Sequence, residues 1–272
     1  MAQTARETRL SRLSHYEKFN PDYLADVVNN QRVHCSDPAH LNDPWDCRPW
    51  FSAKVLEDPG ILEELMAWLL AFKPTSPVTK EQVRDFQAHL RTNPNARQNF
   101  LDTYSEKFLK VIAGRWKIYC LTPIPDSTLM WSHYADNHRG ICLEFALDSP
   151  VFGSAKEVQY LSSYPKWAPH SLMTDTSPHV LLTKSDAWAY EHEYRIIGLS
   201  GGISRPYKDS PLELSGDYLG ISAGALQAVI VGCEADYKRV GNSLEQIAPG
   251  LKIKRAVRAL NEYKLEITEV PE

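Results

Sequence analysis

LMWSHYADNHRGICLEF, residues 129 to 145, joins two histidines, a serine, a tyrosine, an aspartate and an arginine to an apolar run. The run from 141 to 145 is typical of a mostly buried strand, and Gly140 marks its start. The polar side chains before it are therefore expected at a strand edge, gathered in one place. This stretch is the first candidate for a functional site.

Strand-like segments dominate the chain from residue 116 onward. They cover 116–121, 141–145, 157–161, 194–199, 228–231, 252–256 and 264–268, whereas helical spacing in this part occurs at 180–190 and 237–247. Strands and helices do not alternate regularly, so the pattern favours an α+β fold over a doubly wound one.

The first half of the chain has a different organisation. Residues 1–12 are polar and are expected to be loosely ordered, followed by a strand at 13–19, a helix at 22–30 and a strand at 32–36. A helical insert is predicted at 55–115, with three helices separated by Pro74, Pro77 and Pro94. Leu62, Leu65 and Met66 have the spacing of a packed face. We predict a single domain, 1–272, that carries this insert.

Composition excludes several classes of protein. The chain has 272 residues, 43% of them hydrophobic, which is ample for a core. The net charge of -4 gives no general support to nucleic-acid binding. The five cysteines lack a C-x-x-C pair, and no apolar segment resembles a signal peptide or membrane span. A cytoplasmic protein with reduced thiols and no membrane contact is expected.

Four blocks of sequence carry a family resemblance. They are NDPWD at 42–46, LMWSHYADNHRGIC at 129–142, WAYEHEYR at 188–195 and VIVG at 229–232. In this order they resemble the signature blocks of a bacterial family of unknown function. That resemblance implies membership of the family but supplies no activity.

A more distant likeness concerns three other places. A strand and helix at 13–30, the small polar end HCS at 34–36 and the run EHEYRII at 191–197 resemble the three-part motif of the ADP-ribosyltransferase superfamily. The likeness implies a mixed, mainly antiparallel split sheet of ADP-ribosyltransferase-like type. It also implies that NAD is the substrate.

The superfamily likeness assigns roles to particular residues. Glu193 takes the place of the essential glutamate, which stabilises the oxocarbenium-like state formed when the nicotinamide–ribose bond breaks. Glu191 would help to position an acceptor, and both carboxylates would share one face of a strand. His15 or Arg12 would grip the NAD ribose, and Ser36 would orient Glu193.

The motif at 129–145 adds further candidates. Tyr134 could stack on nicotinamide or a base, Arg139 could pair with a phosphate, and His133 could act as a general base. The alternative is that His133, Tyr134 and Asp136 form a buried structural network. On the functional interpretation, the remaining cofactor contacts are Asn42, Asp43, Trp131, Ser132 and His138.

Two other functions stay open. His133, Asp136 and His138, with Glu191 or Glu193, could hold a divalent ion for a hydrolase or nuclease. Against this, the two histidines are five residues apart, which is not the spacing of a helical ligand pair.

The chain could also be a non-catalytic binding module. Glu193 and Arg195 would then be an ion pair on a strand, and the helical insert would bind a partner. For the transferase, the target would be a protein or a nucleic acid. The setting would be a bacterial toxin, with an antitoxin partner, or a phage-defence effector.

Overall fold

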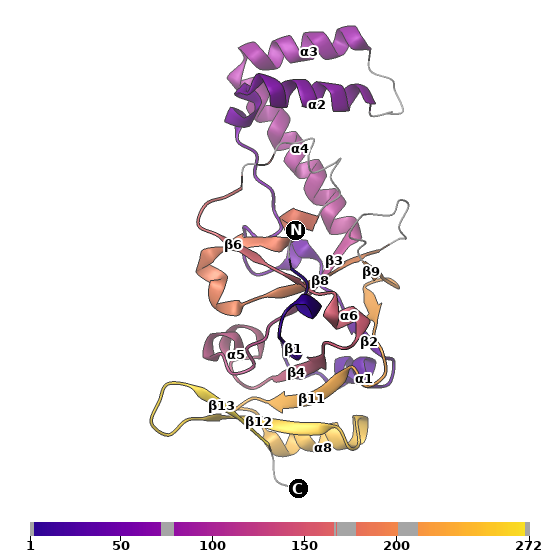
Figure 1. The fold of residues 1–272 in the computed structure, drawn as a ribbon, viewed down its shortest axis with the longest axis vertical. Coiled ribbons are helices and arrows are strands. Elements are labelled where there is room, and N and C mark those ends of the chain that lie inside the picture. Colours follow the sequence, from indigo (N-terminus) through magenta and orange to yellow (C-terminus); the bar gives the residue numbers. More distant parts are fainter. Residues whose placement is uncertain (1–2, 72–78, 166, 168–177, 201–211, 270–272) are drawn as a thin grey trace.

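The computed structural model describes residues 3–71, 79–165, 167, 178–200 and 212–269. Their fold is α+β, with mainly antiparallel sheets in the body and three long helices projecting from one end (Figure 1). The α+β prediction is confirmed. Within these residues, no helix combines the length and apolarity needed to cross a membrane.

A five-stranded sheet forms one half of the body, in the order β1-β4-β11-β12-β13. Its strands are β1 (Arg12–Glu17), β4 (Ile141–Ala146), β11 (Leu226–Val231), β12 (Lys252–Arg258) and β13 (Leu265–Glu269). All neighbours are antiparallel except β11 and β12. The central strands β4 and β11 are almost wholly buried, which explains their continuous apolar runs.

The second sheet contains β3 (Trp116–Leu121), β8 (Tyr194–Leu199) and β5 (Lys156–Glu157), with β9 (Leu212–Glu213) parallel to β8. Two small sheets lie beside it. They pair β2 (Arg32–His34) with β10 (Tyr218–Gly220), and β6 (Gln159–Leu161) with β7 (Thr183–Ser185).

The two larger sheets meet at the edge strands β1 and β3. The backbone N–H of Ser14 donates to the Thr122 carbonyl at 2.7 Å, and that of Thr122 donates back at 2.8 Å. A second bridge pairs Ser36, just after β2, with Ile118 of β3. These bridges bring β1, β2 and β3 together.

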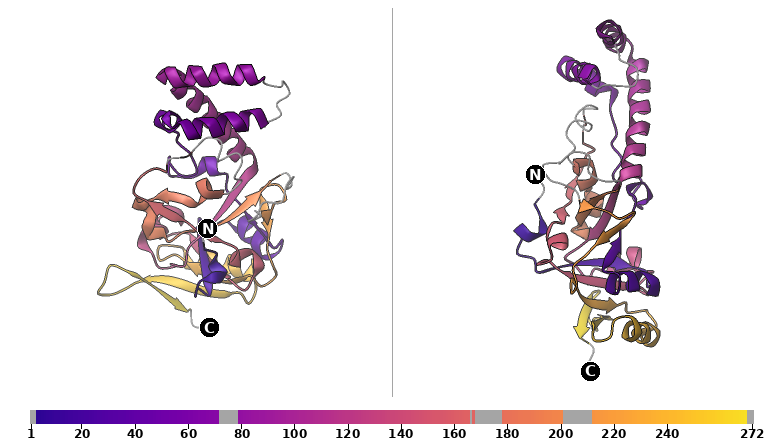
Figure 2. Two further views of the ribbon diagram at one scale, coloured as in Figure 1. Left: turned by 45° about the horizontal axis from the view of Figure 1, so that its top comes forward. Right: turned by 90° about the vertical axis from the view of Figure 1, so that its right-hand side faces the viewer.

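The helices α2 (Pro59–Ala71), α3 (Lys80–Thr92) and α4 (Pro94–Arg115) extend away from the sheets (Figures 1 and 2). A Thr79–Gln82 capping box begins α3, and the Asn93 side chain caps α4. Leu62, Leu65 and Met66 are buried in a core cluster that these helices share.

On the body, α1 (Pro21–Val28) contacts α8 (Tyr237–Ile247) beside the five-stranded sheet. The remaining short helices are η1 (Ala5–Glu7), η2 (Pro38–His40), η3 (Ala53–Glu57), α5 (Thr128–Tyr134), α6 (Pro150–Gly153), η4 (Pro178–Leu182) and η5 (Asp186–Glu191).

Two expectations are corrected. The helix predicted at 180–190 is instead η4, the strand β7 and η5, because 183–185 pairs with β6. The segment 4–8 is packed: Ala5 is fully buried, and its N–H donates to the Ala155 carbonyl at 2.7 Å. The prediction of three helices between 55 and 115 is confirmed.

Candidate functional site

The motif at 129–145 divides into two structural parts. Its first part is α5, a short helix whose N-terminus is capped by the Ser127 side chain. Helix α5 carries His133 and Tyr134 on its last turn. For His133 and Tyr134 the prediction of a strand edge is wrong, because both come from a helix. The polar residues from Asp136 to Arg139 follow the helix and precede β4.

The second part of the motif is a left-handed turn. Asp136, Asn137 and His138 have φ values of 48°, 52° and 67°, a conformation that non-glycine residues adopt at a cost. The His138 carbonyl accepts a hydrogen bond from the backbone of Glu234 at 3.1 Å, and Gly140 leads directly into β4. This half of the motif joins α5 to the five-stranded sheet.

A cavity of about 300 Å³ lies where the two sheets meet. Residues from β1, the end of β2, β3, α5 and the start of β8 line it. The predicted site residues among them are His15, Ser36, Asn42, His133, Tyr134, Glu191 and Glu193. The fold thus brings three separate sequence blocks to one place. We call this space the first cavity.

Glu191 and Glu193 reach the first cavity by a route that the sequence did not predict. Glu191 ends η5, His192 has a left-handed φ of 46°, and β8 begins only at Tyr194. The two glutamates are therefore not i and i+2 of one strand. The turn at His192 nevertheless directs both carboxylates toward the same ammonium, that of Lys184.

Five buried charged side chains form the floor of the first cavity. The Arg195 guanidinium donates to Glu193 Oε1 at 2.8 Å and to Asp46 Oδ1 at 2.9 Å. The Lys184 ammonium donates to Glu193 Oε2 at 3.1 Å and also to Glu191. All five have less than a tenth of their surface exposed. We call Asp46, Lys184, Glu191, Glu193 and Arg195 the charge network.

The network separates the pKa values of its two glutamates. Burial acts against the charge of Glu193, but Arg195 and Lys184 outweigh it and lower the pKa of Glu193 to about 2. The pKa of Glu191 is raised, first by burial and also by the negative charge of Glu193. One carboxylate is thus permanently ionised, and the other takes up a proton more readily.

A chain of hydrogen bonds connects Glu191 to the rim of the cavity. The Tyr134 hydroxyl donates to Glu191 Oε1 at 2.6 Å, and the exposed Asn42 side chain donates to the Tyr134 oxygen at 3.2 Å. Burial and the Glu191 charge raise the pKa of Tyr134, which keeps its hydroxyl protonated. Asn42, Tyr134 and Glu191 therefore form one connected path.

His15 lies on the opposite wall, on β1. Its Nδ1 lies 2.7 Å from the Cys120 carbonyl oxygen, and its ring stacks on Tyr119 with centroids 4.2 Å apart. Burial lowers the pKa of His15 to about 4, so the ring is neutral near pH 7 with Nδ1 as the donor. A neutral, fixed imidazole can bind a hydroxyl group.

Several predicted cofactor contacts do not line the first cavity. Trp131 is fully buried, and its indole N–H donates to the Pro125 carbonyl at 2.9 Å. Asp43 is also buried, and its side chain accepts from the Trp45 backbone. Both side chains therefore lie outside the lining of the first cavity, and cofactor binding at these two positions stays a prediction.

Four other predicted residues also do not line the first cavity. Arg139 is exposed and pairs with Asp136, and Ser132 lies on α5 outside the lining. His138 belongs to the left-handed turn. Arg12 pairs with Glu144, which leaves His15 as the β1 residue of the predicted pair that lines the cavity.

The metal alternative finds no support in the geometry. Among the described residues, no group of three or more His, Cys, Asp or Glu side chains is arranged to hold a metal ion. Asp136 forms an ion pair with Arg139, and the Lys184 ammonium donates hydrogen bonds to the carboxylates of Glu191 and Glu193.

Sequence reasoning missed three members of the charge network. Asp46 lay in the NDPWD block, and Arg195 had been considered only as a partner for Glu193. No sequence pattern indicated Lys184, because a helix at 180–190 does not predict contact between Lys184 and Glu191. A buried lysine and arginine lie among three carboxylates only because the fold brings the segment around Asp46 to β7, η5 and the start of β8.

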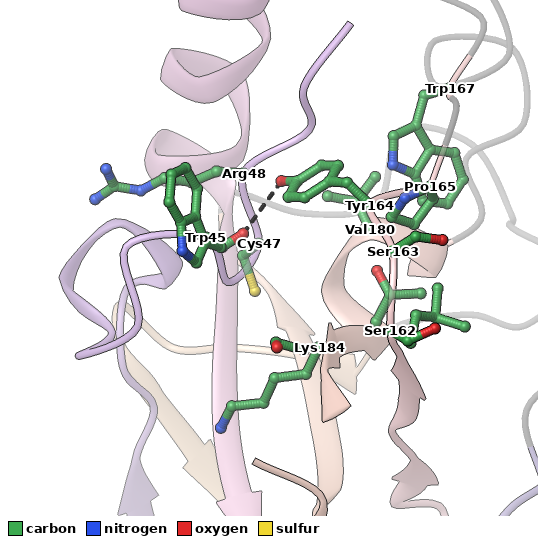
Figure 3. A pocket seen from close by; sticks show the side chains of 13 residues that line it. Trp45, Cys47, Arg48, Ser162, Ser163, Tyr164, Pro165, Trp167, Val180 and Lys184 are labelled. Atoms are coloured by element: carbon green, nitrogen blue, oxygen red, sulfur yellow. Dashed lines mark hydrogen bonds between the residues drawn. The ribbon is translucent and has the colours of Figure 1, made fainter. Parts of the chain in front are cut away.

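A second cavity, of about 250 Å³, lies on the other side of Lys184. Figure 3 shows Trp45 and Arg48 on one side of it, Tyr164 and Trp167 on the other, and Lys184 at its base. The Tyr164 hydroxyl donates to the Trp45 carbonyl at 3.2 Å and closes one edge. Trp45 belongs to the NDPWD block but was not among the predicted site residues.

Comparison with known proteins supplies no further assignment. No family model, curated protein or solved structure matches the chain. Both resemblances described above therefore stay predictions.

Proposed function

We propose that the protein is an NAD-consuming transferase of ADP-ribosyltransferase-like type that acts on a protein or nucleic-acid target. The first cavity is its active site. The likeness in sequence implies a split sheet with a motif residue on each of three strands. In support, the cavity where the two sheets meet is lined by His15 of β1, Ser36 after β2 and Glu193 before β8.

One observation carries the proposal: the five buried charged side chains at the floor of the first cavity hold more carboxylates than cations. When Glu191 is ionised, three carboxylates and two cations leave one net negative charge on the buried floor. The breaking nicotinamide–ribose bond develops positive charge on the ribose. A buried, fixed negative charge stabilises that state more strongly than solvated charge would.

The chemistry follows from these positions. The bond between ribose C1′ and the nicotinamide nitrogen breaks, and its electron pair leaves with neutral nicotinamide. The ionised Glu193 floor stabilises the oxocarbenium-like ribose. A nucleophilic group of the acceptor forms the new bond to C1′ and loses its proton to Glu191, whose raised pKa suits a base. His15 binds a ribose hydroxyl, and Tyr134 holds Glu191 in place.

The two glutamates then have separable roles. Both oxygens of Glu193 accept hydrogen bonds from Arg195, and Oε2 also accepts from Lys184. Glu191 has one such cation and a tyrosine. Glu193 supplies charge, whereas Glu191 exchanges the proton. The setting as a toxin or phage-defence effector rests on the bacterial family resemblance alone.

The test measures nicotinamide release from millimolar NAD by chromatography, with and without cell extract as a source of acceptor. We expect Glu191→Gln to lower release by 100-fold or more, because the amide cannot accept the proton. The matched control is Glu245→Gln, an exposed carboxylate on α8, which should keep the full rate.

Thermal melting of each variant shows whether a lower rate is caused by unfolding of the variant. The proposal fails if the wild-type protein neither releases nicotinamide nor gains thermal stability with NAD. It also fails if a folded Glu191→Gln variant retains the wild-type rate.

A further inference from the structure

The second cavity has the composition of a binding site for a flat ring. Trp45 has 66% of its surface exposed, which is unusual for so large an apolar side chain. It lies across the cavity from Tyr164 and Trp167 (Figure 3), and Ser162 and Ser163 are also among the lining residues. Exposed aromatic side chains are platforms on which bases stack.

Electrostatics restrict the kind of ring compound. The described residues that line the second cavity include two cations, Arg48 and Lys184, and no carboxylate. The Lys184 ammonium is already paired with carboxylates of the charge network. Arg48 is exposed, and one nitrogen of its guanidinium donates a hydrogen bond to the Ala39 carbonyl at 3.2 Å. The guanidinium extends past Trp45, away from the centre of the cavity (Figure 3), and has further donors that suit a phosphate at the rim. The ligand should therefore combine an aromatic ring with an anionic group.

The size of the cavity restricts the ligand further. Pockets for small molecules usually measure about 300 to 1,000 Å³, and this one measures about 250 Å³. A single ring system fits such a volume, but a whole dinucleotide does not. Among the described lining residues, the two cavities share only Lys184.

We propose that the second cavity binds a nucleobase, stacked on Trp45, with the attached phosphate against Arg48. The base could belong to a free nucleotide or to a strand of nucleic acid. The proposal depends only on the second cavity, so it holds whether or not the first cavity consumes NAD.

Isothermal titration calorimetry with AMP tests this directly, because AMP has no nicotinamide–ribose bond that the first cavity could break. Ribose 5-phosphate, which lacks the base, is the comparison ligand. We expect AMP to bind and ribose 5-phosphate not to bind. Trp45→Leu should weaken AMP binding by about 10-fold, from the usual strength of base stacking. Arg48→Gln should weaken AMP but not adenosine.

The matched control is Trp50→Leu. Trp50 is likewise exposed, at 57%, and does not line the cavity, so its replacement should leave AMP affinity unchanged. The inference is overturned if AMP does not bind at 10 mM, or if Trp45→Leu and Trp50→Leu weaken it equally.

A ten-nucleotide single strand distinguishes the two sources of the base. A strand that binds at least 10-fold more tightly than AMP, with an affinity that falls as salt rises, identifies nucleic acid. Equal affinities for the strand and AMP identify a free nucleotide.

Discussion

At the scale of single residues, Glu191 and Glu193 show how environment separates two identical side chains. They are two positions apart and share the Lys184 ammonium, yet only Glu193 also receives the Arg195 guanidinium. That extra cation lowers the pKa of Glu193, while burial raises the pKa of Glu191. The sequence E-x-E alone cannot assign these different states.

The lowered pKa of Glu193 predicts how stability depends on pH. Its folded pKa of about 2 lies below its ordinary value of 4.5. Ionised Glu193 therefore contributes fully above about pH 4.5, and the contribution is lost as the pH falls toward 2. The expected loss is about 3 kcal/mol of unfolding free energy.

Urea denaturation between pH 2 and 7 measures this contribution. Glu193→Gln should be less stable than the wild-type protein at pH 7, and the difference should shrink across that window. Glu245→Gln, which changes an exposed carboxylate, should show a small difference at every pH. A gap between wild type and Glu193→Gln that stays constant from pH 7 to 2 would contradict the assignment.

At the scale of elements, the left-handed turn after α5 explains half of the dense motif. Its three residues of positive φ direct the chain back beneath α5 and into β4. The turn packs against the end of β11: the Gly232 N–H donates to the Gly140 carbonyl at 3.0 Å. The segment 136–140 therefore determines where His133 and Tyr134 stand without itself lining the first cavity.

Replacing Gly232 tests this packing. A Cβ atom there would lie 2.1 Å from the His138 carbonyl oxygen, so backbone must move. We expect Gly232→Ala to destabilise the fold by about 2 kcal/mol or more and to lower the melting temperature by about 5 °C or more. Calorimetric melting measures both quantities.

Gly241→Ala is the control, because its Cβ would meet open space within α8. This variant should be as stable as the wild-type protein or slightly more so, since alanine favours a helix over glycine by about 1 kcal/mol. If both alanine variants melted alike, close packing at Gly232 would not be what holds the turn.

At the scale of the whole molecule, the projecting helices have a core of their own. Leu65 and Leu90 lie in a cluster formed by η3, α2, α3 and α4, separate from the core between the two sheets. Among the described residues that line the two cavities, none belongs to these three long helices. The helices can therefore lose stability without a direct change in either site.

Leu65→Ala should lower the stability of the projecting helices more than that of the two sheets. Leu65 is fully buried, and its truncation should cost about 2 to 5 kcal/mol. Amide hydrogen exchange should accelerate in α2, α3 and α4 much more than in β4 and β11. Leu70→Ala, which truncates a side chain that is 42% exposed in the same helix, should change exchange little. Equal acceleration in helices and sheets would show one cooperative unit instead.

Local patterns in the sequence determined most of the elements. The strands at 116–121 and 194–199 and the helix at 237–247 match their predicted limits, because each depends on the periodicity of neighbouring residues. The helix predicted at 180–190 is wrong, since β7 forms only by pairing with β6, whose partner residues lie 24 positions earlier in the chain. Pairing between distant strands leaves no periodic signal.

The sequence by itself determined the α+β class, the three projecting helices and the residue types of a reactive site. Only the tertiary structure decided which of those residues meet: it brings His15, Tyr134, Glu191 and Glu193 to one cavity and leaves Trp131, Asp43 and Arg139 outside it. The reason is physical. Hydrophobic period is a property of adjacent residues, whereas the pairing of Lys184 and Arg195 with three carboxylates depends on burial and distance between strands.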